Sequence, residues 1–211
     1  MTLTQAGTFA SKNVGTGIVV TAADVLAGTG ATNYTLTQPT GLKANITPKA
    51  LTVTGTVVAN KVYDGTTTAT VTTGVLSGVI AGDVVTLTQA GTFASKNAAT
   101  GIAVTIADTI SGAGASNYTL TQPTGLKANI TPRPLVLTGT RLANGSTSVL
   151  ASILSVTNLV VGDVLTLGGS VTVAAATRGV QAIKTFTTLT LAGTSAANYT
   201  ITGASGSVTL Q

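Results

Sequence analysis

A stretch of twelve residues occurs twice in this chain, 84 positions apart. TLTQAGTFASKN stands at 2–13 and again at 86–97. The likeness extends without a gap, because 38 of the 47 residues in 2–48 are identical to their counterparts in 86–132. Such a period exceeds the roughly 20–50 residues of solenoid repeats and suits a small domain with a core of its own. We therefore predict tandem domains.

A third, diverged copy follows the two similar ones. GDVVTL at 82–87 returns as GDVLTL at 162–167, and SNYTLT at 116–121 returns as ANYTIT at 197–202. The alignment also predicts that KVYD at 61–64 has no counterpart in this third copy. An end unit of an array often differs from the others as a cap, so we expect the third copy to close a longer array.

The domain boundaries are predicted from proline. Pro48 and Pro132 each follow an NIT triplet, where a proline disfavours one continuous sheet and stiffens a short junction. We place boundaries near 48/49 and 132/133, and a boundary near 85/86 stays open as the alternative. The predicted domains are a partial repeat at 1–48, a complete repeat at 49–132 and a diverged terminal repeat at 133–211. Because the partial repeat lacks its initial strands, we expect it to pair with a neighbour or to stay partly open.

Short apolar or alternating runs separated by Gly, Asn, Asp and Pro indicate β-strands throughout. The clearest runs are ALTVTGTVV, ATVTTGVL, DVVTLTQ, GIAVTIAD, NYTLTQP and LKANITP. Only the segment 75–83 has the character of a short helical turn. We predict an all-β fold of tandem small domains arranged end to end, each either a β-sandwich of the immunoglobulin-like kind or a β-grasp-like sheet.

Composition argues against most kinds of chemistry. The chain has no Cys and no His, and its five acidic residues are all Asp. It therefore lacks an imidazole base, a thiolate and the usual soft metal ligands. We predict that the chain is not an enzyme and needs no cofactor.

Charge and hydropathy exclude two classes of partner. Only 7% of residues are charged, against about 25% in typical soluble domains, and the ten basic residues are scattered singly. Nucleic-acid binding usually requires a basic stripe, so we expect no nucleic-acid partner. No apolar run reaches 18 residues and no signal peptide is visible, so we expect no membrane insertion.

Four motifs together resemble a known repeat. KVYDGTTTATV (61–71), GDVVTL, AGTFASKNAATGIAVT (90–105) and ASNYTLTQPTGLKANIT (115–131) are similar to the YDG-type repeat of large bacterial surface adhesins, the filamentous-haemagglutinin-like exoproteins of the two-partner secretion route. Residues 49–132 match the whole pattern and residues 1–48 its second half. Residues 133–211 match weakly and lack the Tyr-Asp pair.

The resemblance implies an extracellular stalk on a bacterial cell, secreted or held at the surface, whose partners are other domains of the same long chain. The alternative is a carbohydrate- or protein-binding module of the adhesin, which would contact surface glycans or a partner adhesin during surface or biofilm attachment. Exposed edge strands also make side-by-side association between chains a prediction.

The repeat motifs supply the candidate structural residues. Tyr63, Asp64 and Gly65 are expected to form a hairpin turn, in which Gly supplies a positive φ, Asp caps its own turn and Tyr packs over the sheet. The alternative for this triplet is a recognition tip. The tyrosines of the three NYT triplets are expected to anchor each core with the hydroxyl at its edge: Tyr34, Tyr118 and Tyr199. The same triplets are glycosylation sequons.

The sequence suggests two further kinds of site. Asp64, Asp83 and Asp163 are candidate Ca²⁺ ligands, although such a site usually needs six to eight oxygens. Lys61 with Asn45 or Asn129 is the nominal candidate for an isopeptide cross-link.

Overall fold

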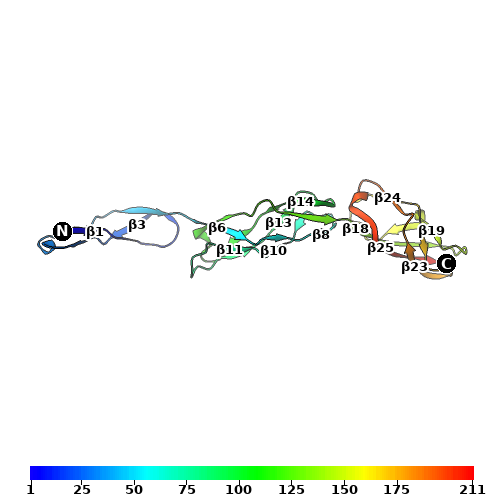
Figure 1. The fold of residues 1–211 in the computed structure, drawn as a ribbon, viewed down its shortest axis with the longest axis horizontal. Coiled ribbons are helices and arrows are strands. Elements are labelled where there is room, and N and C mark those ends of the chain that lie inside the picture. Colours follow the sequence, from blue (N-terminus) through cyan, green and yellow to red (C-terminus); the bar gives the residue numbers. More distant parts are fainter. The chain divides into compact units, whose positions relative to one another are not determined.

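The protein is an all-β molecule, which confirms the class predicted from the sequence. A computed structural model describes all of residues 1–211 (Figure 1). Its helical elements are four single-turn 3-10 helices: η1 (Ala31–Asn33), η2 (Ala115–Asn117), η3 (Ala151–Ile153) and η4 (Ala196–Asn198). No helix has the length and apolar character needed to cross a membrane.

The chain folds as two compact units that do not follow the sequence repeats. Unit 1 contains residues 1–55, 74–88 and 108–123, and unit 2 contains residues 56–73, 89–107 and 124–211. We call the predicted repeats copy 1 (1–48), copy 2 (49–132) and copy 3 (133–211). Every strand ladder joins strands of the same copy.

Unit 1 is built from ten short strands in four small sheets. Its ladders pair β1 with β4, β2 with β3 and β5, β6 with β11 and β16, and β12 with β15; only the β6–β16 pair is parallel. The strands are β1 (Thr2–Thr4), β2 (Gly7–Phe9), β3 (Gly15–Ala22), β4 (Val25–Ala27), β5 (Lys43–Ile46), β6 (Lys49–Thr54), β11 (Val75–Ser77), β12 (Thr86–Thr88), β15 (Thr109–Ser111) and β16 (Tyr118–Thr121).

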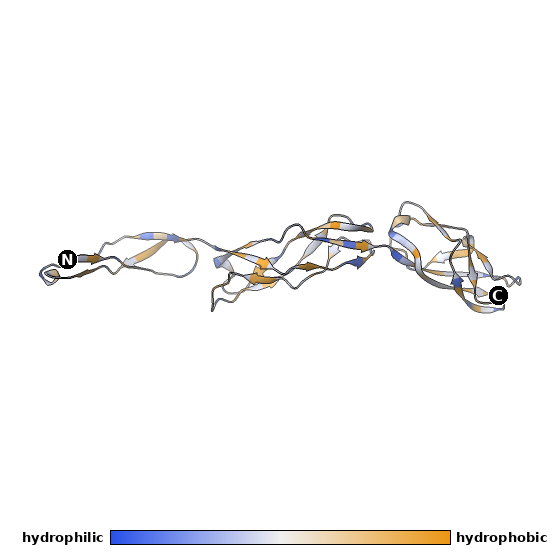
Figure 2. Cartoon of the chain, in the orientation of Figure 1, coloured by the Kyte–Doolittle hydropathy of each residue, from blue (hydrophilic) through white to orange (hydrophobic).

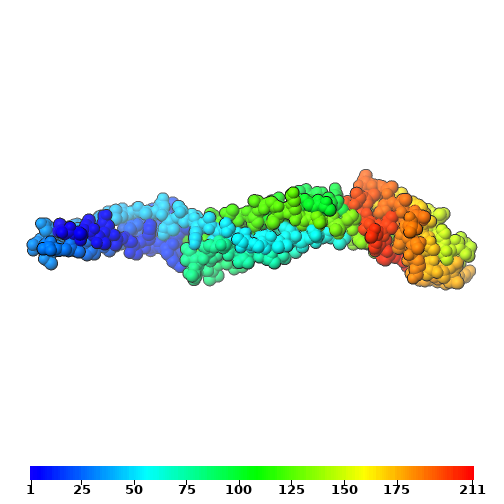
Figure 3. Space-filling view, viewed as in Figure 1, coloured from blue at the N-terminus to red at the C-terminus, as the bar shows by residue number.

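Burial in unit 1 is confined to copy 2. Leu51 is fully buried and Tyr118 nearly so. None of residues 1–48 is buried, although copy 1 has counterparts of every strand in the second half of copy 2 except β16. Phe9 is 40% exposed, whereas its counterpart in copy 2, Phe93 of unit 2, is 2% exposed. Copy 1 therefore consists of two small open sheets without a core. Its residues are drawn in shades of blue in Figure 3.

In unit 2, copy 2 contributes one curled five-stranded sheet and a short hairpin. The sheet has the order β8-β17-β14-β13-β9, and β7 pairs with β10. Along β14, buried Val104 and Ile106 alternate with exposed Thr105, as the two-residue period of a strand requires. The strands are β7 (Val57–Val58), β8 (Lys61–Val62), β9 (Thr68–Ala69), β10 (Val71–Thr72), β13 (Gly91–Phe93), β14 (Ala99–Ile106) and β17 (Lys127–Thr131).

The hairpin predicted at Asp64-Gly65 is present only in part: its two arms pair with each other at the base, through β7 and β10, and separate towards the turn. The strands on either side of it, β8 and β9, are the two opposite edges of the five-stranded sheet. The sheet curls, so the turn links one edge to the other. The helical turn expected in 75–83 is absent: β11 is followed by a β-turn at 80–83, closed by a 3.0 Å bond from the Asp83 amide to the Ile80 carbonyl.

Copy 3, which lies wholly in unit 2, holds more buried residues than either other copy. Its six-stranded sheet has the order β19-β22-β23-β25-β18-β20, and β21 pairs with β24. Figure 3 shows it as one rounded body, yellow-green to red. The strands are β18 (Arg133–Arg141), β19 (Ser148–Leu150), β20 (Leu154–Val156), β21 (Thr166–Gly168), β22 (Ser170–Val173), β23 (Gly179–Thr185), β24 (Thr190–Ala192) and β25 (Tyr199–Leu210).

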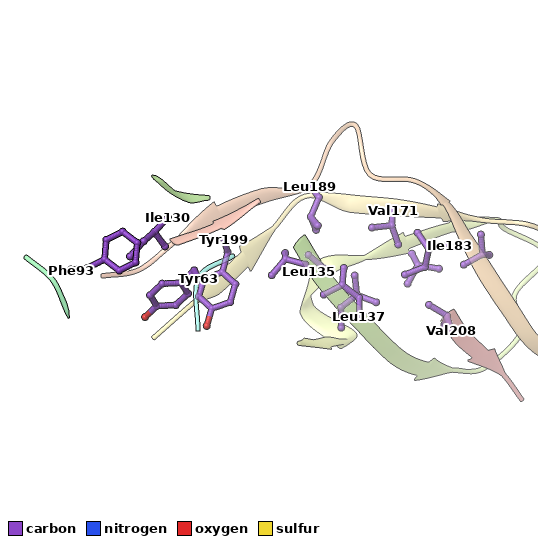
Figure 4. Packing of buried hydrophobic residues seen from close by; sticks show 14 of the residues in the cluster. Tyr63, Phe93, Ile130, Leu135, Leu137, Val171, Ile183, Leu189, Tyr199 and Val208 are labelled. Atoms are coloured by element: carbon purple, nitrogen blue, oxygen red, sulfur yellow. The ribbon is translucent and has the colours of Figure 1, made fainter. Parts of the chain in front are cut away.

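The core of unit 2 is continuous across the boundary between copies 2 and 3. Buried side chains of both copies, from Phe93 and Ile130 to Leu137 and Val208, belong to one hydrophobic cluster (Figure 4). Figure 2 shows apolar positions spread along the strands and few strongly hydrophilic segments, in keeping with the low content of charged residues. The place where the two copies meet is therefore packed like an interior.

Candidate functional site: the junctions between copies

The junction between copies 2 and 3 lies within unit 2 and centres on Asp163. A β-turn presents this carboxylate: the Asp163 amide donates to the Val160 carbonyl at 3.0 Å, and Gly162 has a φ of 89°. A positive φ at the third turn position is characteristic of a type II turn and favours glycine. Within unit 1, Ile80, Gly82 and Asp83 form the same turn in copy 2.

A tyrosine that begins a strand fixes each turn. Tyr199, at the start of β25, accepts a 2.8 Å hydrogen bond from the Val160 amide and donates one to Asp163 Oδ2 at 2.7 Å. In unit 1, Tyr118 accepts from the Ile80 amide at 3.0 Å and donates to Asp83 Oδ2 at 2.6 Å. Both rings are nearly buried. The second and third NYT tyrosines are therefore core anchors with their hydroxyls at the edge, as the sequence predicts.

Tyr63 of copy 2 completes the junction with copy 3. Its hydroxyl lies 2.9 Å from Asp163 Oδ2 and 3.1 Å from Oδ1. Its ring meets the Tyr199 ring edge to face, with the centroids 5.6 Å apart and the planes at 75°. Figure 4 shows the two rings side by side between Phe93 and Leu135. Tyr63 is only 1% exposed, and its contacts with Asp163 and Tyr199 make it a buried link to the next copy.

The turn after Tyr63 is held by local bonds. Asp64 Oδ1 accepts from the Thr66 amide at 2.9 Å, and Gly65 has a φ of 78°, so the predicted capping by Asp and positive φ at Gly are confirmed. Lys61 Nζ bonds Asp64 Oδ1 and the Thr66 carbonyl, both at 2.8 Å. The turn itself touches copy 3, because a Cβ added at Gly65 would lie 2.5 Å from Val160 Cγ1.

A second contact at the junction uses the asparagine of the NYT triplet. Asn198 Oδ1 accepts from the Ala98 amide at 2.8 Å, and its Nδ2 donates to Asn97 Oδ1 at 3.2 Å. Asn198 is 6% exposed, so the amide is shielded from water.

The same contact joins copies 1 and 2 within unit 1. There Asn117 Oδ1 accepts from the Val14 amide at 2.9 Å, and its Nδ2 donates to Asn13 Oδ1 at 3.1 Å. Lys12 adds an ion pair at 3.5 Å to Asp83 Oδ1. The two junctions therefore use the same residue types at the same repeat positions.

The environment shifts the pKa values of the junction groups. Burial, followed by the hydrogen bond to Asp163, raises the pKa of Tyr63 to about 12. Burial would raise the pKa of Asp163, but hydrogen bonds from Tyr199, Tyr63 and Ser195 outweigh it and hold the pKa below its ordinary value. The hydrogen bond from Tyr118 similarly lowers the pKa of Asp83. Asp163 therefore sits between two phenols as a carboxylate, an arrangement suited to binding and not to proton transfer near neutral pH.

Tyr34 departs from the prediction for the three tyrosines, because it is 64% exposed and anchors no core. The partners of Tyr118, Ile80 and Asp83, lie 38 and 35 positions before it in the chain. The positions equivalent to Ile80 and Asp83 would lie the same distances before Tyr34, which is outside residues 1–48. Tyr34 therefore has no turn to bind within copy 1.

Copy 3 has a counterpart of KVYD, contrary to the alignment. Arg141 bonds Asn144 Oδ1 and the Ser146 carbonyl, as Lys61 bonds the Asp-Gly turn of copy 2. The Ala143 amide donates to the Gln211 carbonyl at 2.8 Å, as the Tyr63 amide donates to the Thr131 carbonyl at 2.9 Å. Ala143 therefore stands where copy 2 has its junction tyrosine.

The hypothesis of a metal site gains no support from the structure. No three acidic side chains come together. Each candidate ligand has its own partners: Asp64 bonds Lys61, Asp83 bonds Tyr118, and Asp163 bonds Tyr63 and Tyr199.

The isopeptide candidates are likewise engaged elsewhere. Lys61 Nζ is bonded at the Asp-Gly turn. Asn129 Oδ1 accepts from the Gly101 amide at 2.7 Å, and Asn45 Oδ1 accepts from the Gly17 amide at 2.8 Å. A cavity of about 420 Å³ in copy 3 is lined by Ala, Leu, Val, Ser and Thr and holds no acidic or basic side chain.

Sequence reasoning missed two features of the junction. It treated the NYT asparagines only as sequons, and it weighed the GDV aspartates only as metal ligands. Their joint persistence in copies 2 and 3 was the available signal, because a carboxylate, a phenol and an amide kept at fixed spacing suggest a shared structural role.

Comparison with known proteins supports the repeat pattern. A family model described as the YDG domain matches residues 47–125 and 127–207. Searches of curated proteins and of solved structures find no match.

Proposed function

The chain belongs to the YDG domain family, and from this we propose that it forms extracellular stalk repeats of a bacterial surface adhesin. In this role the copies extend a distal binding region from the cell, at the surface or on a secreted protein of the filamentous-haemagglutinin-like kind. The function is mechanical and involves no turnover or cofactor. The partners are other domains of the same long chain.

The observation that carries the proposal is the burial of Tyr63 between two copies. A freely jointed linker would leave each copy to turn independently, whereas here a phenol, a carboxylate and a second phenol are packed together. The Asn198 amide fixes a second point of contact. Two separate contacts resist both bending and rotation at a junction, which a spacer requires.

The composition of the chain suits the same role. With 7% charged residues, the repeats depend little on ion pairs that salt would screen. Only two salt bridges are present, Lys12–Asp83 and Lys61–Asp64. Such repeats would keep their junctions in external media of varying ionic strength.

Solution scattering tests the spacer role. A compact globule of this length has a radius of gyration of about 17 Å. We expect a clearly larger value for the chain, and a further change when Tyr63→Ala and Asn198→Ala are combined to loosen the junction. A compact profile for the unaltered chain would contradict the proposal.

Location and ligand are tested separately. Antibodies against the chain should label intact cells that produce it, and labelling only after lysis would refute the cell-surface role.

A glycan array probed with the full chain tests the alternative function, a carbohydrate- or protein-binding module in surface or biofilm attachment. Selective binding to a glycan would favour that alternative. A sedimentation coefficient that rises with concentration would support side-by-side association.

A further inference from the structure

Copy 2 carries, within unit 1, the same docking turn that copy 3 uses to hold Tyr63. Four residues of copy 2 correspond to four of copy 3: Ile80 to Val160, Asp83 to Asp163, Asn117 to Asn198 and Tyr118 to Tyr199. The bond from the turn amide to the tyrosine hydroxyl is 3.0 Å in copy 2 and 2.8 Å in copy 3. The bond from that hydroxyl to the aspartate is 2.6 Å in copy 2 and 2.7 Å in copy 3. The turn in copy 3 holds a tyrosine from the preceding copy. The turn in copy 2 has the same acceptor and no such tyrosine.

A cavity of about 270 Å³ lies beside this turn. Among the residues that line it are Ile46, Lys49, Ile80 and Asp83. Ile80 is 53% exposed, and Ile46 keeps partial exposure, whereas its counterpart in copy 2, Ile130, is 1% exposed in the cluster that contains Tyr63. The apolar wall that a tyrosine ring would cover is thus present and uncovered.

A free strand edge leads into the same cavity. β17 pairs with β14 on one side and, in parallel, with β8 on the other, through Ile130–Lys61 and Thr131–Val62. β5, the counterpart of β17 in copy 1, pairs only with β3. Its open edge presents the backbone groups that a strand like β8 would bond.

We propose that this edge and cavity receive a Lys-Val-Tyr-Asp-Gly segment, equivalent to residues 61–65, from YDG repeat sequence joined in tandem ahead of residue 1. The incoming Lys-Val pairs in parallel with β5, and the tyrosine amide donates to the Thr47 carbonyl as Tyr63 donates to Thr131. Its hydroxyl then donates to Asp83. The segment completes the open sheet of copy 1 and locks that copy to copy 2.

The identity of the residue at the tyrosine position gives the site its selectivity. A copy like copy 3, which has Ala143 at the tyrosine position, would supply neither the ring nor the hydroxyl. The inference holds wherever the protein is located, so it does not depend on the proposed stalk role.

The test compares the chain with an extended chain in which residues 49–84 are placed directly before Met1, so that Met1 takes the place of Val85. Amide hydrogen exchange is followed in segments 43–49 and 80–83. We expect the extension to slow exchange there by about tenfold or more. Replacing the added tyrosine by Ala should reverse the slowing at 80–83, and Phe should reverse part of it.

Controls within the same molecule separate docking from general stabilisation. Tyr63→Ala in the extended chain should speed exchange near 127–133 and 160–163 and leave 80–83 unchanged. Equal exchange at 80–83 in the chain, the extended chain and its Tyr→Ala variant would overturn the proposal. Slowing by a free peptide of residues 61–71, without slowing by the extension, would overturn the tandem arrangement.

Discussion

At the scale of single residues, Tyr63 combines an aromatic contact with a charge-assisted hydrogen bond. Removing only its hydroxyl in Tyr63→Phe keeps the ring against Tyr199 and deletes the donor to Asp163. Hydrogen bonds to charged groups contribute about 1.5–3 kcal/mol, and Asp163 keeps its bond from Tyr199, so we expect a loss of about 1–2 kcal/mol in the free energy of unfolding of unit 2. Urea denaturation measures it.

A double-mutant cycle isolates this interaction. Asp163→Asn and Tyr63→Phe combined should cost less than the sum of the two single changes. Tyr34→Phe is the matched control, since Tyr34 is 64% exposed, and it should change stability by less than about 0.5 kcal/mol. Additive effects at Tyr63 and Asp163 would show that the hydroxyl contributes nothing specific to the junction.

Gly65 is a second single residue on which the junction depends. Gly65→Ala should destabilise unit 2 more than Gly145→Ala, by about 1–3 kcal/mol, the usual cost of overpacking. The two glycines have the same backbone strain to bear, with φ of 78° and 77°. They differ in surroundings: an added Cβ would lie 2.5 Å from Val160 Cγ1 at Gly65 and would meet nothing within 4 Å at Gly145. Equal losses in thermal denaturation would place Gly65 outside the junction.

At the scale of elements, the loop before β14 and the start of β25 are joined through one amide. Asn198→Ala removes the acceptor for the Ala98 amide and the donor to Asn97, so a half-buried N–H loses its partner. We expect a loss of about 1–3 kcal/mol in unit 2, measured by chemical denaturation.

The other two NYT asparagines give graded controls for this change. Asn117→Ala removes the same pair of bonds in unit 1, where the side chain is only half-buried, and should cost less. Asn33→Ala changes an exposed residue and should be nearly neutral. If Asn33→Ala cost as much as Asn198→Ala, the effect would come from the 3-10 turn and not from the junction.

Most elements of this fold were predictable, because strand periodicity and turn residues are local. The run GIAVTIAD gives β14, and NYTLTQP gives β16. The Asp-Gly hairpin was predicted only in part, because the pairing of β7 with β10 is local, whereas the separation of β8 and β9 to opposite edges depends on the curl of the whole sheet.

The candidate site was less predictable, because its contacts cross between copies. Tyr63 and Asp163 are 100 positions apart, and nothing local to either indicates the other. The counterpart of KVYD was missed because Ala-Asn occurs at 59–60 and at 143–144, so two placements of the gap score alike. Only the bonds of Arg141 and Ala143 distinguish them.

At the scale of the whole molecule, burial is uneven among the copies, and stability should follow it. No residue of copy 1 is buried, whereas copy 3 contributes most of the core cluster of unit 2. Amides of residues 1–48 should therefore exchange first and those of β18 and β25 last. Hydrogen-exchange mass spectrometry on the full chain measures this order, and uniform exchange along the chain would contradict it.

The stability of the molecule should have a plateau in pH between two limits set by the junction groups. Three carboxylates set the acid limit, those of Asp64, Asp83 and Asp163. Their pKa values are lowered in the folded state, to about 2 for Asp64 against an ordinary 3.8. Their contribution is present above about pH 4 and is lost as the pH falls towards 2. Tyr63 sets the alkaline limit: its pKa is raised from 10.0 to about 12, so its contribution is present below pH 10 and is lost between 10 and 12.

Between these limits the chain has no histidine to titrate, so the urea midpoint should stay nearly constant from about pH 5 to 9. Tyr63→Phe tests the assignment of the alkaline limit, because it removes the titrating hydroxyl and should flatten the decline above pH 10 while leaving the acid decline caused by Asp64 in place. An alkaline decline as steep in Tyr63→Phe as in the unaltered chain would assign that limit to other groups, such as the lysines. Since the hydroxyl and the Asp163 carboxylate form one contact, loss of the alkaline slope together with the coupling in the double-mutant cycle would identify the same bond by two independent measurements.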